Sequence, residues 1–183
     1  VFFDGNALYS EGSSDLFVCL LDTAGNVLWA KSAGGLENDY AKSITLDNAG
    51  NIYVNVGAPS NSCQEKDRTK GSMGMMPCPI LDSAGGIWQF KVDQLNQSYA
   101  SGVRYATGLR NVVGLDWNNQ LNQLFVTQHG RDMLNNLYPD LYDTTVSAEL
   151  PSETMYAIKK GDNAGWPYIY YDHFKGKKMM APE

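Results

Sequence analysis

The sequence predicts an all-β chain built from repeated hairpins. Short β-rich runs follow one another along the 183 residues, and eighteen glycines offer turns between them. Hydrophobic residues make up 43% of the chain and aromatic residues 11%, which favours a packed core over disorder. The hairpin pattern recurs, and this recurrence predicts the architecture.

Two hairpins with nearly the same turn open the chain. Residues 15–29 read DLFVCLLDTAGNVLW and residues 43–56 read SITLDNAGNIYVNV, each with two strands around a polar turn. The turns DTAGN and DNAGN start 25 residues apart and differ at one position. Aspartate opens such a turn by bonding its own backbone, and glycine supplies the positive φ that other residues resist. Cys19, in the first hairpin, is expected to be a buried free thiol.

Further strands continue the pattern. A third hairpin is predicted at residues 112–126, and shorter strands at residues 86–92 and 154–158. Because such hairpins cannot bury their faces alone, their recurrence predicts blades of a β-propeller. At roughly 40 to 50 residues per blade, the chain would supply three to four blades. Residues 1–183 are thus expected to form one propeller domain or a fragment of one, with residues 1–40 as a repeat-like blade.

The hairpin at residues 112–126 should bring two polar segments together. In a hairpin, the residue before the first strand lies beside the residue after the second. Arg110 and Asn111 are therefore expected to lie near residues 128–132, which read QHGRD. A guanidinium in that place can hold two ligand oxygens with its planar fork. The alternative is a surface arginine paired with an acid such as Asp116.

Composition argues against two classes of partner. The chain has 14 basic and 20 acidic residues and a formal charge of −6, with one small basic cluster at Lys175, Lys177 and Lys178. Nucleic acid is therefore not an expected partner. No run of about 18 apolar residues occurs, so no membrane span is predicted. The opening residues VFFDGNALYS also lack the pattern of a signal peptide.

Two cysteines bracket a loop rich in Gly, Met and Pro. The loop QEKDRTKGSMGMMP lies between Cys63 and Cys78. No second Cys or His lies at ligand spacing from either cysteine, which argues against a metal site. We expect a disulfide between them, which would require an oxidising compartment.

Several separated motifs resemble one enzyme family. They are AKSITLD, GNIYVNVGAPSN, the two cysteines, GGIWQF, GLRN, QHGRD, SAELPSE and GWPYIYYD. In this order, residues 41–183 resemble the sugar dehydrogenases that use pyrroloquinoline quinone, and most closely their sorbosone dehydrogenase-like branch. Residues 15–54 also resemble bacterial β-propeller repeats with recurring D-x-x-G-N turns. The resemblance implies a six-bladed propeller, so the chain would be a fragment, would close with a second copy, or would have remodelled its ends.

The resemblance also implies two cofactors and their ligands. Arg110 and Asn111 match an Arg-Asn pair that contacts the quinone oxygens, and His129 and Arg131 would lie at the same site. The His129-Gly130-Arg131 turn lies where the family binds calcium, with the carbonyls of Gly130 and Arg131 as ligands. Asp132, Glu149 or Glu153 would add charge, since calcium prefers oxygen donors. The glucose dehydrogenase version reads Gln-Gly-Pro where this chain reads His-Gly-Arg.

The general base is the least defined part of the implied site. The family has a histidine at the position that is Asp39 here, and neither His129 nor His173 aligns with it. Asp39 could accept a proton but is a weaker base than imidazole, and the alternative is that it belongs to the repeat pattern. Aromatic residues in GWPYIYYD could stack on a sugar or on the cofactor, or they could fill space between blades. They are Trp166, Tyr168, Tyr170 and Tyr171.

Two functions of different kinds follow. The first is a periplasmic or secreted aldose or sorbosone-type dehydrogenase, or a fragment of one, that oxidises a sugar by hydride transfer to pyrroloquinoline quinone with Ca²⁺ bound. Its partners would be the sugar and an electron acceptor. The alternative is a non-catalytic β-propeller module for binding or assembly that has lost its base. In either case two copies could associate and complete the propeller.

Overall fold

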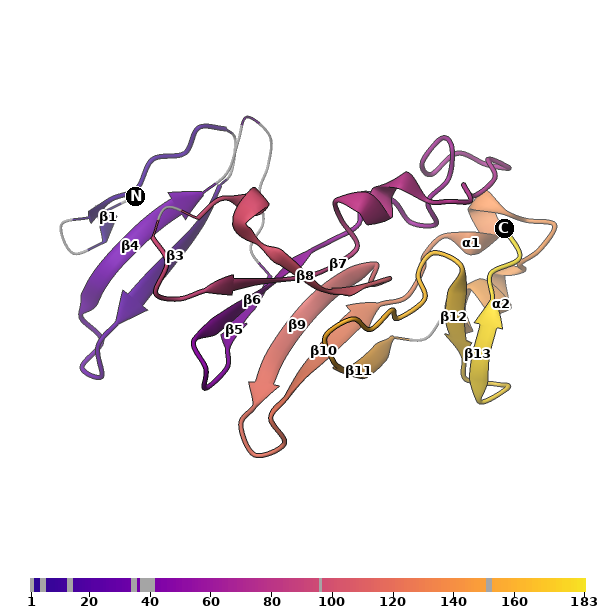
Figure 1. Cartoon of the computed structure of the whole chain (residues 1–183). Coiled ribbons are helices and arrows are strands. Elements are labelled where there is room, and N and C mark those ends of the chain that lie inside the picture. Colours follow the sequence, from indigo (N-terminus) through magenta and orange to yellow (C-terminus); the bar gives the residue numbers. More distant parts are fainter. Residues whose placement is uncertain are drawn as a thin grey trace. The chain divides into compact units, whose positions relative to one another are not determined.

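The computed structural model describes residues 2–3, 6–12, 15–33, 36, 42–95, 97–150 and 153–183. Strands dominate these residues and the helices among them are short, so the all-β prediction is confirmed (Figure 1). Contacts divide the chain into two compact units, Val1–Lys42 and Ser43–Glu183. None of the helices in the described parts of the chain is long and apolar enough to cross a membrane.

The first unit contains two antiparallel hairpins, β1 (Phe2–Phe3) with β2 (Asn6–Ala7) and β3 (Leu16–Leu21) with β4 (Val27–Ala33). The β3–β4 hairpin and its DTAGN turn confirm the sequence prediction. Oδ1 of Asp22 accepts from the backbone N–H groups of Ala24 at 2.9 Å and Asn26 at 2.8 Å. Cys19 is a free thiol as expected, but it is only partly buried because a two-stranded ribbon covers little of each side chain.

The second unit begins with a four-stranded antiparallel sheet. Its order is β5 (Ile44–Leu46), β6 (Asn51–Val56), β7 (Gly86–Lys91) and β8 (Val103–Thr107). The predicted hairpin forms β5 and β6, and the DNAGN turn repeats the bonds of the first turn around Asp47. Gly50 has a φ of +73°, as the turn requires. The short strand β8 was not predicted, because VRYAT carries a charge and little alternation.

A three-stranded sheet follows, in the order β11 (Thr154–Ile158), β10 (Gln123–His129), β9 (Asn111–Asn118). These strands confirm the third predicted hairpin and the strand at residues 154–158. A last hairpin pairs β12 (Ile169–Asp172) with β13 (Lys177–Met180). The remaining elements are the short helices η1 (Pro79–Asp82), η2 (Tyr99–Ser101), α1 (Leu134–Leu137) and α2 (Thr144–Glu149).

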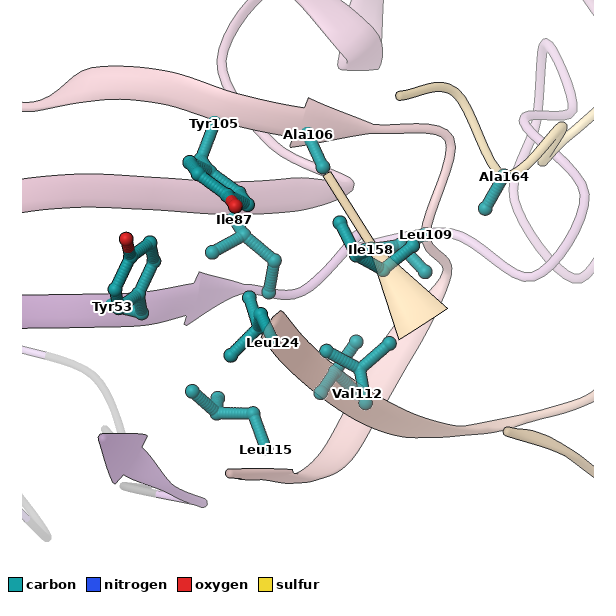
Figure 2. Close-up of a cluster of buried hydrophobic side chains, with 11 residues drawn as sticks. Tyr53, Ile87, Tyr105, Ala106, Leu109, Val112, Leu115, Leu124, Ile158 and Ala164 are labelled. Atoms are coloured by element: carbon teal, nitrogen blue, oxygen red, sulfur yellow. The ribbon is translucent and has the colours of Figure 1, made fainter. Parts of the chain in front are cut away.

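The core lies between the four-stranded and three-stranded sheets (Figure 2). Ile87 and Leu124, one from each sheet, are fully buried there. The edge of β5 also meets β9, where the hydroxyl of Thr45 accepts from the backbone N–H of Trp117 at 3.1 Å. Two antiparallel sheets packed in this way are compatible with neighbouring blades. The closed ring of a propeller stays a prediction.

Candidate functional site

The arginine predicted at the start of β9 does meet the turn that follows β10. One guanidinium nitrogen of Arg110, Nη1, donates to the carbonyl of Gly130 at 2.7 Å, and Nη2 donates to Oδ2 of Asp132 at 3.2 Å. The backbone N–H of Arg110 donates to the side chain of Gln128 at 3.0 Å. The expected convergence of these two segments is therefore confirmed. The alternative partner Asp116 lies elsewhere, since its carboxylate accepts from the hydroxyl of Thr45.

The guanidinium of Arg110 is buried and only partly hydrogen-bonded. Only 9% of its side chain is exposed, and its Nε is buried without a hydrogen-bond partner. Burial lowers the pKa of Arg110, and the neighbouring charge of Asp132 opposes that effect. Because arginine still stays protonated in proteins, the site holds a permanent, poorly solvated positive charge.

A strand register places Asn111 beside His129. The two residues are paired directly across β9 and β10, so their side chains project on the same side of the sheet. Nδ1 of His129 lies 2.8 Å from Oε2 of Glu153, which precedes β11. Both members of this pair are more than half exposed. The structure thus brings Asn111, His129 and Glu153 together at the end of the sheet that also holds Arg110.

A second arginine, which sequence reasoning missed, shares Asp132 with Arg110. Nη1 and Nη2 of Arg68 donate to the two carboxylate oxygens of Asp132 at 2.8 Å and 3.3 Å. Burial by itself would raise the pKa of Asp132, but the hydrogen bond from Arg68 and the charges of both arginines outweigh it and hold that pKa below its usual value. Asp132 is therefore an ionised bridge between two guanidinium groups. No local motif predicts this contact, because 64 residues separate its ends.

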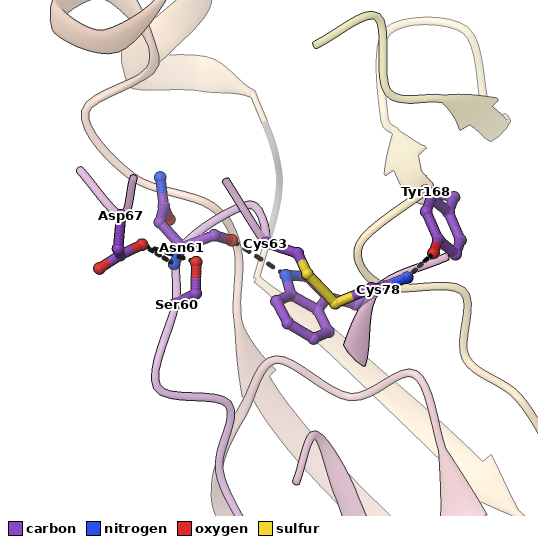
Figure 3. Close-up of a disulfide and its surroundings, with 7 residues drawn as sticks. Ser60, Asn61, Cys63, Asp67, Cys78 and Tyr168 are labelled. Atoms are coloured by element: carbon purple, nitrogen blue, oxygen red, sulfur yellow. Dashed lines mark hydrogen bonds between the residues drawn. A yellow bond between two sulfur atoms is a disulfide. The ribbon is translucent and has the colours of Figure 1, made fainter. Parts of the chain in front are cut away.

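Asn61 fixes the backbone of Asp132. Its Nδ2 donates to the carbonyl of Asp132 at 2.7 Å, and its Oδ1 accepts from the N–H of the same residue at 3.0 Å. The carbonyl of Asn61 accepts from the indole of Trp166 at 2.9 Å, and its N–H donates to Asp67 (Figure 3). Asn61 is fully buried. Its place in the motif GAPSN was visible in the sequence, but its partner was not.

The expected disulfide between Cys63 and Cys78 is present, with the Cα atoms 6.2 Å apart (Figure 3). The loop that it closes carries Arg68. Within that loop the buried amide of Gln64 donates to the carbonyls of Thr69 and Ser72 and accepts from the backbone N–H of Arg68. The loop is therefore ordered by its own hydrogen bonds as well as by the disulfide.

The side chain of Arg131 has a structural partner. It forms a buried ion pair with Glu183, with 4% and 1% of the two side chains exposed. Its guanidinium also lies 4.5 Å from the ring centre of Tyr170. Arg131 also lines the pocket described below, but its guanidinium is already paired with Glu183, and the role expected for it in cofactor binding stays a prediction.

The aromatic residues of GWPYIYYD contribute both to packing and to a pocket, and Trp166 takes part in both. Trp166 and Tyr168 pack against the disulfide, and the hydroxyl of Tyr168 accepts from the N–H of Cys78 at 2.5 Å. Tyr170 and Tyr171 lie on the wall of a pocket with a cavity volume of about 30 Å³. The pocket is lined by Arg110, Gln128, His129, Gly130, Arg131, Thr154, Tyr156, Trp166, Ile169, Tyr170 and Tyr171. It is far smaller than the several hundred Å³, roughly 300 to 1,000, of a ligand site that encloses its ligand.

Three of the predicted metal ligands, the Gly130 carbonyl, Asp132 and Glu153, have other partners. The Gly130 carbonyl accepts from Arg110, and Asp132 accepts from both arginines. Glu153 pairs with His129, and Glu149 is an exposed residue at the end of α2. Across the described ranges, no three His, Cys, Asp or Glu side chains gather as metal ligands would. Asp39, the expected base, lies outside the described residues.

Comparisons with known proteins find one matching family and two solved structures of similar fold. The family model for glucose/sorbosone dehydrogenase matches residues 22–183. No curated protein matches the chain. Two solved structures of a Trichoderma reesei carbohydrate-active enzyme of family AA12, one described as an iodide and one as a calcium structure, share its fold.

The likeness to these solved structures is one of fold. Sequence identity is 15% and 14%, with TM-scores of 0.59 and 0.57. Each match covers 86% of this chain and 40% of the solved chain. The chain therefore spans about 40% of the length of the structures it resembles.

Proposed function

The chain belongs to the glucose/sorbosone dehydrogenase family, and on that premise we propose that it carries part of the cofactor site of a sugar dehydrogenase that uses pyrroloquinoline quinone. The observation that carries this proposal is the buried guanidinium of Arg110 at the wall of an aromatic pocket. When bound, the quinone would take up the hydride that leaves the sugar carbon. The protein would supply binding, orientation and charge.

The residues present fit an anionic, planar group. Arg110 has an unpartnered buried Nε, and a buried donor of this kind favours an oxygen acceptor. Asn111 and His129 add polar groups beside it, and the rings of Tyr156 and Tyr170 form apolar walls. We assign the quinone oxygens to Arg110 and Asn111. The small volume of the pocket means that these residues would contact only part of the cofactor.

Calcium fits this arrangement less well. Its expected ligands, the Gly130 carbonyl and the Asp132 carboxylate, both accept hydrogen bonds from the Arg110 guanidinium. A cation at the same oxygens would be repelled by that guanidinium at close range. Calcium binding would therefore require the Arg110 guanidinium to leave these two oxygens. No step of the reaction is assigned to the ion.

Two side chains remain proposals for the group that accepts the sugar proton. One is Asp39, at the family's histidine position. The other is His129, which lines the pocket. If Glu153 holds the proton on Nδ1 of His129, then Nε2 is the acceptor of the neutral ring. A carboxylate that orients an imidazole in this way is a common arrangement for a base.

The remaining features of the proposal concern the whole protein. The Cys63–Cys78 disulfide is compatible with a periplasmic or secreted location. A six-bladed propeller, a sugar substrate, an electron acceptor and a second copy that completes the ring remain proposals. They draw on the family and on the packed antiparallel sheets of the second unit.

The test is direct binding of pyrroloquinoline quinone to the purified chain, followed by calorimetry and by the quinone absorbance band, with and without calcium. We expect saturable binding that weakens by about tenfold or more in Arg110→Gln, because a charge-assisted hydrogen bond is lost. The matched control is Arg104→Gln, since Arg104 bonds Thr107 and the Asp82 carbonyl away from the pocket.

Dye-linked oxidation of aldoses and sorbosone by the loaded protein then tests catalysis. Absence of quinone binding by the folded wild-type chain would reject the proposed function and favour the non-catalytic module. Equal binding by Arg110→Gln and the wild type would reject the assignment of Arg110.

A further inference from the structure

One residue of the loop closed by the disulfide, Arg68, contacts the candidate site by bonding Asp132. We propose that Arg68 is a positioning residue for Arg110 and acts on it through the carboxylate of Asp132. The ligand that Arg110 would then hold, a carboxylate-bearing planar quinone, rests on the proposed function. The positioning itself concerns only groups within this chain.

The side chains of Arg68, Asp132 and Arg110 form a chain of charge-assisted hydrogen bonds. Arg68 holds both oxygens of Asp132, and Asp132 holds Nη2 of Arg110. The side chains of Arg68 and Asp132 are 43% and 51% exposed, whereas that of Arg110 is only 9% exposed. A half-exposed pair thus fixes a buried group whose orientation matters for the pocket.

Arg110 needs this second contact because a guanidinium held at one point can still turn. The Gly130 carbonyl holds Nη1, and it fixes one end of the planar fork. Asp132 holds Nη2 and sets the plane of the fork, which decides where the unpartnered Nε points. Water competes for the carboxylate of Asp132, since half of that side chain is exposed. Two bonds from Arg68 keep the carboxylate directed at Arg110.

The position of Arg68 is itself determined by the loop. Its backbone has a φ of +50°, a left-handed conformation that few residues other than glycine adopt. The N–H of Arg68 donates to Oε1 of Gln64 at 3.0 Å, and Gln64 directly follows Cys63 of the disulfide. Asn61, just before the disulfide, holds the backbone of Asp132. Residues at and next to this loop therefore bond Asp132 at two places: Asn61 bonds its backbone and Arg68 bonds its carboxylate.

The charge of the group also favours an anionic ligand. Arg68 and Arg110 bring two positive charges, and Asp132 neutralises one of them. Each guanidinium lies within the electrostatic reach of the other, and the charge of Arg68 contributes to the lowered pKa of Arg110. Carboxylate oxygens suit such a pair of planar donors.

The experiment is a double-mutant cycle on quinone binding, with Arg68→Gln, Asp132→Asn and the double variant. We expect Arg68→Gln to weaken binding by about two- to fivefold, the range for a partly exposed ion pair. If Arg68 acts through Asp132, the same substitution has no further effect in the Asp132→Asn background. Arg68→Lys keeps the charge but lacks the planar fork that bonds the two carboxylate oxygens through separate nitrogens, so this variant should also bind the quinone more weakly than the wild type. Arg104→Gln serves as the matched control and should bind like the wild type.

A second readout needs neither quinone nor activity. The Nε–H of Arg110 in the ligand-free chain can be followed by ¹⁵N NMR and by its exchange with solvent. We expect this signal to shift or to exchange faster in Arg68→Gln and to stay unchanged in Arg104→Gln. An unchanged Arg110 signal in Arg68→Gln overturns the proposal, and so does a loss of binding that adds in full to that of Asp132→Asn. Failure of the wild type to bind quinone would reject the proposed function, while the NMR comparison would still decide the positioning.

Discussion

Replacement of Asn61 by alanine tests the attachment of the candidate site to the fold. Asn61 is fully buried, and its side chain makes two hydrogen bonds to the backbone of Asp132. The substitution removes both bonds and leaves the N–H and C=O of Asp132 without these partners. At about 1 kcal/mol per hydrogen bond, plus the cost of a poorly satisfied backbone group, we expect a loss of about 2 to 4 kcal/mol in the free energy of unfolding.

Urea unfolding followed by tryptophan fluorescence measures this loss. Trp166 is a suitable probe, because it is buried and its indole donates to the Asn61 carbonyl. With a urea m-value of about 2 kcal/mol/M, the unfolding midpoint should fall by roughly 1 to 2 M. The control is Asn118→Ala, which removes one hydrogen bond in an exposed turn and should cost about 0.5 to 1 kcal/mol. If Asn61→Ala costs no more than this control, the amide does not anchor Asp132.

Three further outcomes follow from the structure. Replacement of Cys63 and Cys78 by serine should lower the free energy of unfolding by about 3 kcal/mol, because the bond closes a loop with a sequence separation of 15; equal urea midpoints for the variant and the oxidised wild type would contradict this. Tyr53→Phe removes a hydroxyl that donates to Asp47 at 2.8 Å and accepts from Gln89 at 3.0 Å, so we expect a loss of about 1 to 2 kcal/mol by the same assay, and an unchanged or raised stability would count against these bonds. The pKa of Asp132 lies below its usual value in the folded chain, so its ionised form stabilises the fold above the unfolded pKa of about 4, and this contribution is lost as pH falls through the folded pKa. The difference in urea midpoint between the wild type and Asp132→Asn should therefore shrink from pH 7 to pH 3, and a difference that stays constant would show that the carboxylate charge is not the cause.

Much of the fold follows from local sequence patterns. The strands of all three predicted hairpins are present, because their turns carry the residues that the backbone needs. Asp22 and Asp47 bond the turn that follows each of them, and Gly25 and Gly50 take the positive φ. The β12–β13 hairpin has a similar turn, in which Asp172 accepts from the backbone N–H of Lys175 and Gly176 takes a positive φ, but it was not predicted. The short strand β8 lacks such a signal and forms through pairing with its neighbour in space. Strand β8 pairs with β7 across a register shift that no local pattern encodes.

The candidate site was predictable only in part. Hairpin geometry was enough to predict that Arg110 lies near residues 128–132, since this is a property of two adjacent strands. The sequence left open which aromatic residues pack against the disulfide and which line the pocket, because Trp166 and Tyr168 bond partners that are 105 and 90 residues away along the chain. Asp39 lies outside the described residues, so its role stays a prediction.

The sequence alone determined the all-β class, the three hairpins, the disulfide and the approach of Arg110 to the turn after β10. These depend on interactions between residues close along the chain, or on a cysteine pair whose chemistry limits its partners. Only the tertiary structure decided that Asp132 is shared by Arg68 and Arg110 and held by Asn61. The physical reason is that a hydrogen bond across more than 60 residues depends on how whole loops pack, and many polar side chains in the chain could have satisfied the same groups.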